Sequence, residues 1–337
     1  MLPIIFLDLT IFIAVTIGIL GIFFFGLAFS LPSKKRINFK GKHVLVTGGS
    51  KGIGKQIAIE SIKKGGNVSI IARNVTDLKN TCDELNKLSE ELKNGAKAFW
   101  YSADMSDDYK IIEKVIRESE DKCGPVDILI NNAGVSTQAT FDNLPIEAFD
   151  KQMKLNYLSC VYATRVVIDN MKKRKSGHIG FVCSAAGQCA IWGYTAYSPS
   201  KFAVRGFAEA LNMELLPFNI GITVVYPPNT KTEGFERECI EMPEELQIIG
   251  SSAGTFEPSY VAQKFVEGIE NGEFAVNIGL DGWMLGHLTS GGSPENNIIS
   301  AATQIFFNGI FRGILLFYIG HFNRIVARCK RKRETTE

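Results

Sequence analysis

Short apolar runs alternate with longer stretches of mixed polarity through the middle of the chain. The runs are rich in β-branched residues and have the length of buried strands, whereas the stretches between them are long enough for helices. Six strands are predicted in this way, at 43–47, 68–72, 98–102, 128–130, 178–184 and 223–226. Strands that alternate with helices predict an α/β fold with a Rossmann-like, doubly wound parallel sheet.

The N-terminal segment 3–31 is almost wholly apolar and is long enough to cross a bilayer. A secretory signal is the rival interpretation, but its apolar region would be shorter and would follow basic residues. Here the basic residues Lys34, Lys35 and Arg36 come after the apolar segment. The positive-inside rule therefore places these charges, and the chain behind them, in the cytosol.

A second apolar segment, 305–319, carries a narrow polar stripe. Gln304, Asn308 and Arg312 recur every four residues and so share one face of a helix. An amphipathic helix packed on its own domain is one alternative, and a full membrane span containing an arginine is costly. We expect a helix that lies in or dips into the membrane interface, followed by a basic tail that suits an anionic leaflet.

These patterns divide the chain into a transmembrane anchor at 1–32, a globular domain at 41–283 and a C-terminal membrane-associated segment at 284–337. The formal net charge is +2 and the basic clusters are short, so we expect no nucleic-acid partner. The cysteines number seven, which is odd, and none forms a Cys-x-x-Cys pair. They predict reduced thiols in the cytosol, with neither a disulfide framework nor a metal site.

A glycine-rich turn with the sequence TGGSKGIG follows the first predicted strand at 47–54, and a helical pattern begins directly after it. Glycines let the backbone approach a pyrophosphate, and the start of the helix offers free N–H groups. Strand, glycine turn and helix in this order therefore predict a dinucleotide site. Its expected contacts are Gly48, Ser50, Lys51, Gly52 and Gly54.

The end of the second predicted strand indicates which dinucleotide binds. An NAD site normally carries Asp or Glu there to hold the ribose 2′-hydroxyl, whereas this chain has Arg73. Arginine complements a 2′-phosphate, and Lys51 can add charge, although Asp77 weakens the positive field. The charges predict NADPH as the cofactor; the alternative is that Arg73 is only a solvated strand end.

Tyr197 and Lys201 stand four residues apart, and Ser184 precedes them at the end of a predicted strand. Residues four apart share a helix face, so the ammonium can lower the pKa of the phenol and make it a usable proton donor. A Tyr-x-x-x-Lys pair alone occurs by chance on surface helices. Here the preceding nucleotide signal favours a catalytic pair.

The order of these motifs resembles the short-chain dehydrogenase/reductase family over about 41–279. The matching segments are Thr47-Gly48-x-x-x-Gly52-x-Gly54, Asn131-Asn132-Ala133-Gly134, Asn156, Ser184 and Tyr197-x-x-x-Lys201. The resemblance implies a carbonyl reductase with an NADP-binding domain at 41–283. It also implies that Tyr197 donates a proton, that Lys201 holds the nicotinamide ribose, and that Ser184 binds the substrate oxygen.

The same resemblance implies three further roles. Asn156 would hold a water in a proton relay, Asp104 would meet the adenine, and Asn131 would line the cofactor cleft. Segment 232–256 is polar and mixed, and we expect it to form a mobile substrate lid.

Pro227-Pro228 departs from the Pro-Gly of many family members, but members that reduce a long-chain lipid ketone share it. We therefore expect a reductase of such a lipid at the endoplasmic reticulum membrane. A reductase of a steroid or retinal ketone and a catalytically inactive nucleotide-binding scaffold are the alternatives, and the intact Ser184, Tyr197 and Lys201 argue against the scaffold. A homo-oligomer is compatible with the sequence, which does not determine the oligomeric state.

Overall fold

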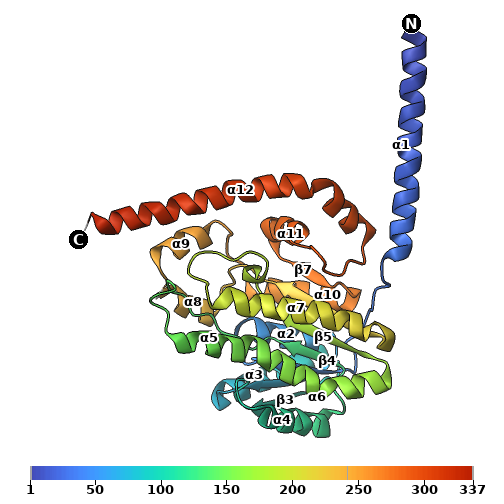
Figure 1. Ribbon diagram of the computed structural model, residues 1–337. Coiled ribbons are helices and arrows are strands. Elements are labelled where there is room, and N and C mark those ends of the chain that lie inside the picture. Colours follow the sequence, from blue (N-terminus) through green and yellow to red (C-terminus); the bar gives the residue numbers. More distant parts are fainter. Residues whose placement is uncertain (1, 241, 336–337) are drawn as a thin grey trace.

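The computed structural model describes residues 2–240 and 242–335, and within them one parallel sheet has the strand order β3-β2-β1-β4-β5-β6-β7 (Figure 1). The strands are β1 His43–Thr47, β2 Asn67–Ala72, β3 Ala98–Ser102, β4 Ile128–Asn131, β5 Gly177–Val182, β6 Ile220–Tyr226 and β7 Ala275–Asn277. The predicted doubly wound α/β fold is confirmed. β7 was missed because it has only three residues and one of them, Ala275, is exposed.

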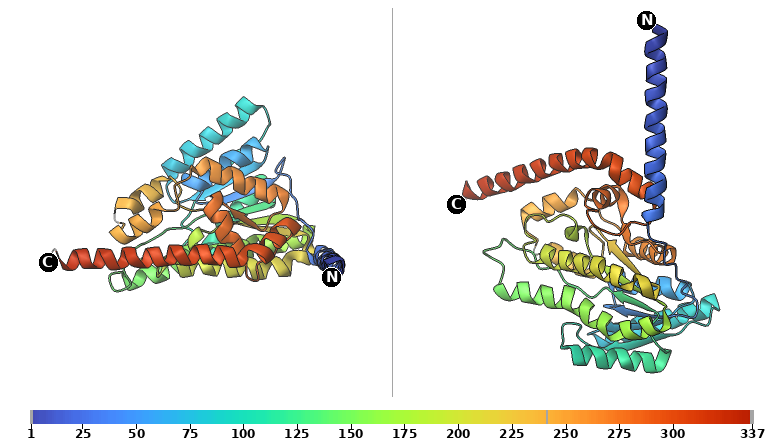
Figure 2. Two further views of the ribbon diagram at one scale, coloured as in Figure 1. Left: turned by 90° about the horizontal axis from the view of Figure 1, so that it is seen from above. Right: turned by 45° about the vertical axis from the view of Figure 1, so that its right-hand side comes forward.

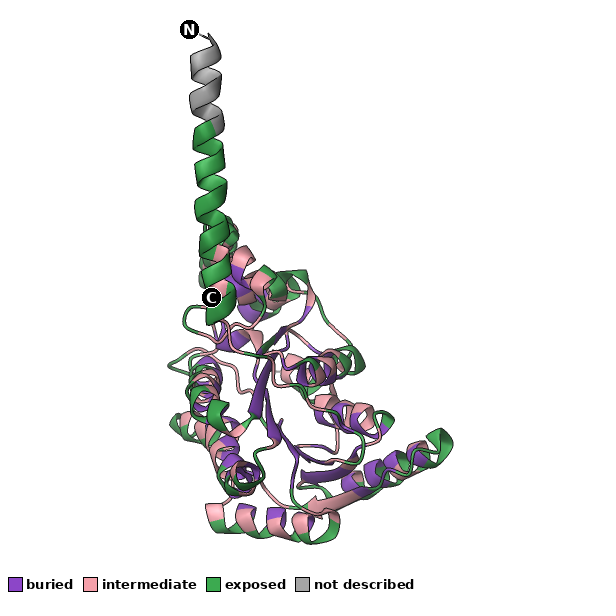
Figure 3. Ribbon diagram, turned by 90° about the vertical axis from the view of Figure 1, so that its right-hand side faces the viewer, coloured by how far each residue is buried: buried purple, intermediate pink, exposed green. Residues whose placement is uncertain are grey.

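Helices cover both faces of the sheet. One face carries α2 Gly52–Lys63, α3 Val75–Leu92 and α10 Pro258–Asn271, and the other carries α4 Tyr109–Cys123, α6 Ser159–Arg174 and α7 Tyr197–Leu215. Successive side chains of β1 enter opposite cores, since Leu45 packs in one cluster and Val44 and Val46 in the other. A strand buried on both faces must be largely apolar, which explains the apolar runs, and the central strands are buried along their length (Figure 3).

The strand order reverses beside β1, whose two neighbours are β2 and β4. Val46 pairs with Ile130 of β4, and Thr47 pairs with Ile71 of β2, so the carboxyl ends of these strands meet at one edge. The segment that follows β1 leads to a helix on one face of the sheet, and the segment that follows β4 leads to helices on the other face. Such a reversal opens a crevice at the carboxyl edge of the sheet, where ligands bind in folds of this type.

Helix α1, Leu2–Ser30, projects away from the domain (Figures 1 and 2). Within it, Ile11–Ser30 is long and apolar enough to cross a membrane, and none of that segment is buried. Phe12, Ile22 and Phe29 are exposed, which is unfavourable in water and favourable in lipid. The predicted N-terminal apolar helix is confirmed, and its length and composition support membrane association.

Helix α12 extends over Ile298–Glu334 and is much longer than the predicted segment 305–319. Asn297 caps its start, because the Asn297 carboxamide oxygen accepts the N–H of Ile299 at 2.9 Å. The helix lies across α11 Gly279–Leu288 and α9 Glu244–Ser251 (Figure 1). It is also long and apolar enough to cross a membrane, with little of that window buried.

The basic end of α12 meets the domain. Lys332 pairs with Glu244 at 2.8 Å and Arg333 pairs with the buried Glu245 at 2.5 Å. Part of the tail that was expected to face an anionic leaflet therefore pairs with carboxylates of α9. The sequence prediction missed this extension because the basic stretch has no apolar periodicity of its own, and the ion pairs depend on tertiary contact.

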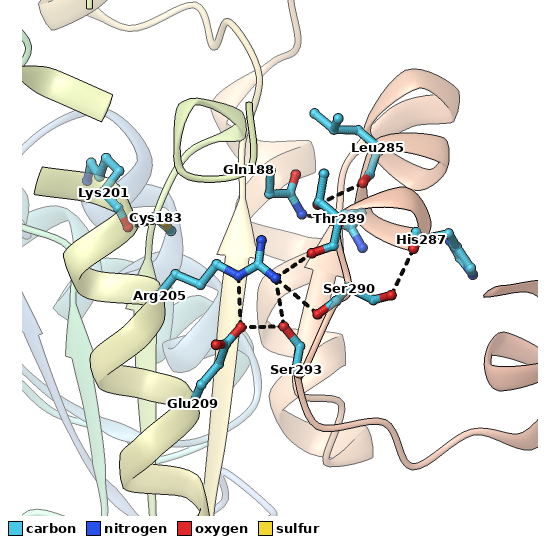
Figure 4. A network of polar contacts seen from close by, with 11 residues as sticks. Cys183, Gln188, Lys201, Arg205, Glu209, Leu285, His287, Thr289, Ser290 and Ser293 are labelled. Carbon is cyan, nitrogen blue, oxygen red and sulfur yellow. Dashed lines mark hydrogen bonds and ion pairs between the residues drawn. The ribbon is translucent and has the colours of Figure 1, made fainter. Parts of the chain in front are cut away.

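The other end of α12 is held through the segment that joins it to α11 (Figure 4). Arg205 of α7 donates to the Thr289 carbonyl at 2.5 Å and to the Ser290 carbonyl at 3.1 Å. Its Nε also donates to Glu209 at 2.8 Å, and Glu209 accepts a bond from the Ser293 hydroxyl. These bonds connect α7, which begins with Tyr197, to the segment 289–293 that leads to α12.

Candidate active site

A cavity of about 1310 Å³ lies at the carboxyl edge of the sheet. Its walls come from the glycine turn, the ends of several strands, the lid segment and α12. Ser184, Tyr197 and Lys201, which sequence reasoning assigned to catalysis, all line it. The structure therefore brings the three predicted catalytic side chains to one place.

Each of the three is positioned by a different local element. Ser184 directly follows β5, and its hydroxyl accepts the N–H of Ala186 at 3.1 Å in a short 3₁₀ turn. Tyr197 is the first residue of α7, and Lys201 follows one turn later on the same face. Lys201 Nζ lies 5.8 Å from the centroid of the Tyr197 ring and donates to the Val182 carbonyl at 3.1 Å.

The pKa of Tyr197 moves opposite to the sequence expectation. Burial raises the pKa of the phenol, a hydrogen bond with Ser184 acts against that rise, and the charge of Glu238 adds to it. Lys201 lies over the ring and is bonded to a backbone carbonyl, so the predicted lowering by its ammonium does not dominate. A phenol with a raised pKa is protonated at neutral pH, which is the state that a proton donor requires.

The glycine turn is fastened to the end of β4. The Thr47 hydroxyl accepts the N–H groups of Asn132 at 3.0 Å and Ala133 at 3.1 Å. The Asn132 side chain donates to the carbonyls of Thr47 at 2.9 Å and Gly48 at 3.1 Å. Gly48 has φ +64, and a Cβ there would lie 2.9 Å from the Asn132 amide nitrogen, so this position requires glycine.

Four of the five predicted turn residues line the cavity, namely Gly48, Ser50, Lys51 and Gly52. Gly54 does not. A Cβ on Gly54 would lie 2.3 Å from the Gly48 carbonyl oxygen, so this glycine allows α2 to pack against the turn. The turn and the start of α2 together offer the N–H groups that a pyrophosphate binds.

Asn131 does not line the cavity, contrary to expectation. It is buried, and its amide donates to the Thr164 hydroxyl of α6 at 3.3 Å. Its neighbour Asn132 lines the cavity instead. Neighbouring positions of an extended chain face opposite sides, so the motif fixes the place but not which asparagine faces the ligand.

Asn156 also lies behind the cavity wall and not in it. It sits in a π-helical turn, Met153–Leu158, and is buried. Its carboxamide oxygen accepts the Val135 N–H at 2.8 Å, and its amide donates to the Val135 carbonyl and the Ser200 hydroxyl, each at 2.9 Å. Both amide hydrogens are therefore engaged, and the side chain fixes the strand-end loop beside Lys201.

The charged groups around the predicted adenosine end form pairs. Arg73 is largely exposed and lies 3.7 Å from Asp104, and both line the cavity. Hydrogen bonds from Ser106 hold the Asp104 carboxylate and, together with Arg73, lower its pKa despite its partial burial. Lys51 lies 3.2 Å from Asp77 and 2.9 Å from Glu233. The two expected cations are present, and each has a carboxylate partner.

The lid segment forms two helices, α8 Glu233–Ile240 and α9, and both contribute to the cavity. Glu238 of α8 was missed, because an acidic residue in a mixed segment carries no sequence signal. From α12, Phe311, Leu315, Tyr318 and Phe322 also line the cavity. Among the described residues no group of His, Cys, Asp and Glu could hold a metal ion.

The short chain dehydrogenase family matches residues 42–240. The chain belongs to this family. It is 45% identical over 304 residues to the 3-dehydrosphinganine reductase of Danio rerio, covering 90% of this chain and 91% of that protein. It is 44% identical over 310 residues to the 3-ketodihydrosphingosine reductase of Bos taurus, covering 91% and 93%.

An X-ray structure of an alcohol dehydrogenase from the archaeon Thermococcus sibiricus, complexed with 5-hydroxy-NADP, is similar with a TM-score of 0.56. The identity is 22%, and the match covers 66% of this chain and 87% of the archaeal chain. This likeness shows a shared fold.

Gly54→Ala should weaken NADPH binding while leaving the fold largely intact. The new methyl group would press on the Gly48 carbonyl and displace the turn, and overpacking of this kind costs about 1–3 kcal/mol, which corresponds to roughly 5- to 150-fold in affinity if the loss falls on binding. Gly206→Ala is the matched control, because Gly206 lies in α7 with open space around its Cβ position. Dissociation constants from NADPH fluorescence would test this, and equal affinity in both variants would contradict it.

Proposed function

We propose that the protein reduces 3-ketodihydrosphingosine (3-dehydrosphinganine) to dihydrosphingosine (sphinganine) with NADPH, in sphingolipid synthesis. The observation that carries the proposal is the extent of similarity to relatives named for that reaction, which spans nine-tenths of the chain. The convergence of Ser184, Tyr197 and Lys201 in one cavity supports it.

The chain's own residues account for the proton and for the orientation of the ketone. The Ser184 hydroxyl and the Tyr197 phenol both line the cavity, and Ser184 acts on the pKa of Tyr197, so we expect both hydroxyls to donate to one ketone oxygen. The bound nicotinamide would supply a hydride for the carbonyl carbon, and Tyr197 would give its proton to the oxygen. Lys201 would hold the nicotinamide ribose, and Asn156 would act as a positioning residue through the loop at Val135.

The residues fit the proposed cofactor. Gly48, Ser50 and Gly52 line the cavity where the pyrophosphate would lie, and a Cβ on Gly48 would strike the Asn132 side chain and so displace the turn. Arg73 at the end of β2 would bind the 2′-phosphate, whose dianion is a stronger partner than the single carboxylate of Asp104. Asp104 lies beside it in the position proposed for the adenine contact.

A lipid substrate fits the apolar side of the cavity. Phe311 and Leu315 of α12 line it, and other apolar side chains of the same helix, including Phe317, remain exposed. Extraction of a long alkyl chain into water costs about 0.8 kcal/mol for each CH₂ group. A cavity bordered by a membrane-associated helix lets the tail stay in an apolar environment while the ketone reaches Tyr197.

Membranes containing the protein should reduce 3-ketodihydrosphingosine with NADPH, and mass spectrometry should identify dihydrosphingosine. Tyr197→Phe should lower turnover by about 10²–10⁴-fold while NADPH still binds, because only the transferable proton is removed. Lys201→Ala should reduce both turnover and NADPH affinity. Strong activity on a steroid or retinal, with none on the sphingoid ketone, would favour the second candidate substrate class.

NADPH should be preferred to NADH, and Arg73→Asp should reverse or abolish the preference. The change removes a cation and adds a repulsive carboxylate at the 2′-phosphate. Lys79→Asp controls for the change in charge, since Lys79 lies on the neighbouring α3 against Trp100 and outside the cavity. The ratio of kcat/KM values for the two nicotinamides decides the matter, and equal use of both by the unmodified protein would refute the assignment.

We also propose that α1 spans the endoplasmic reticulum membrane once, with the catalytic domain in the cytosol. Lys34, Lys35 and Arg36 follow α1, and positive residues remain on the cytosolic side. Protease added to sealed microsomes should digest the chain from about residue 41 onward. Complete protection that is lost only in detergent would reverse the proposed orientation.

A further inference from the structure

Five carboxylates line the cavity among the described residues: Asp77, Asp104, Glu233, Glu238 and Asp281. Three of them already face a cation, because Asp77 and Glu233 pair with Lys51 and Asp104 with Arg73. Asp281 is exposed on α11. Glu238 differs from these four, because its charge acts directly on the catalytic residues Tyr197 and Lys201.

Glu238 is held in place from the loop that follows β4. Gln138 donates its amide to the Glu238 carboxylate at 3.0 Å, and the backbone N–H of Ser136 donates to the same group. Both donors lie in a loop that lines the cavity. The carboxylate therefore has a fixed position in the cavity wall, to which Tyr197 and Lys201 also contribute.

The substrate proposed above carries an amino group on the carbon next to its ketone. When the ketone oxygen meets Tyr197, the amine must lie within the same part of the cavity. An ammonium that leaves water requires a negative partner, because the unpaired burial of a charge is costly. Lys201, the charged group that binds the ribose, cannot serve, since it has the same sign.

We propose that Glu238 binds the ammonium group of the substrate and so selects long-chain 2-amino ketones over ketones that lack the amine. This inference rests on the proposed function. It assigns the apolar side of the cavity to the alkyl tail and the lid carboxylate to the polar head. Closure of α8 over the substrate then places the charge at the correct end of the molecule.

The ionisation of Glu238 makes the selection depend on pH. Burial raises the pKa of Glu238 to about 7, and the Lys201 ammonium and the Ser136 N–H act in the opposite direction. The carboxyl is therefore neutral below about pH 7 and charged above it in the free enzyme. The other titratable groups that its charge affects are Tyr194, Tyr197 and Cys239, and burial raises the pKa of each, so they remain neutral over this range.

The test compares two substrates, 3-ketodihydrosphingosine and the same ketone without the amine, with NADPH and the full chain in membranes. Glu238→Gln should lower kcat/KM for the amino ketone by about 10–100-fold, the usual effect of losing a charged hydrogen bond. For the deaminated ketone the change should stay below about threefold. Glu236→Gln is the matched control on the same helix, since Glu236 is exposed and outside the cavity.

In the unmodified enzyme, kcat/KM for the amino ketone divided by kcat/KM for the deaminated ketone should fall as the pH is lowered from about 8 to about 6, because Glu238 takes up a proton. This fall should be absent in Glu238→Gln. If Glu238→Gln lowers kcat/KM equally for both substrates, Glu238 only holds helix α8 in place, and the inference is overturned. A selective loss in Asp281→Asn in place of Glu238→Gln would overturn it too. If the unmodified enzyme reduces neither 3-ketodihydrosphingosine nor the deaminated ketone, the proposed function is wrong, and so is the inference that rests on it.

Discussion

The contact between the ends of β1 and β4 is the constraint on which the site depends. Thr47 receives two backbone N–H groups from the β4 side, and Asn132 returns two hydrogen bonds to the β1 side. The connections diverge here to opposite faces of the sheet, so without these bonds the crevice would have buried backbone groups with no partners. One set of four bonds fixes the glycine turn and the loop that reaches Asn156 and Glu238.

The sequence was sufficient to locate the first six strands, although the fully buried β6 begins three residues before its predicted start. β1 was predicted at its observed bounds because its central residues Val44, Leu45 and Val46 are apolar on both faces, as a strand between two helical layers requires. It was insufficient where tertiary contact decides the outcome. The length of α12 depends on the pairing of Lys332 and Arg333 with α9, and β7 depends on its pairing with β6.

The same division applies to the site. The spacing of Tyr197 and Lys201 predicted their shared position, because helical periodicity is local. The direction of the Tyr197 pKa was not predictable, since the burial that raises it comes from segments distant in sequence. The choice between Asn131 and Asn132 depends on which side of the chain faces α6, and Glu238 enters the cavity only because α8 folds over it.

Helix α12 connects the N-terminal helix α1 with the wall of the cavity, two regions that the sequence analysis treated separately. In the first part of α12 the ring centroid of Phe306 lies 5.8 Å from that of Phe24 in α1. At the other end of the helix, two ion pairs connect it to α9. The wall of the cavity is thus in contact with helix α1, so in the proposed membrane-bound enzyme a lipid would reach the cavity by diffusion within the bilayer plane. Turnover would then follow the mole fraction of the ketone among membrane lipids, and its concentration in the surrounding water would have little influence.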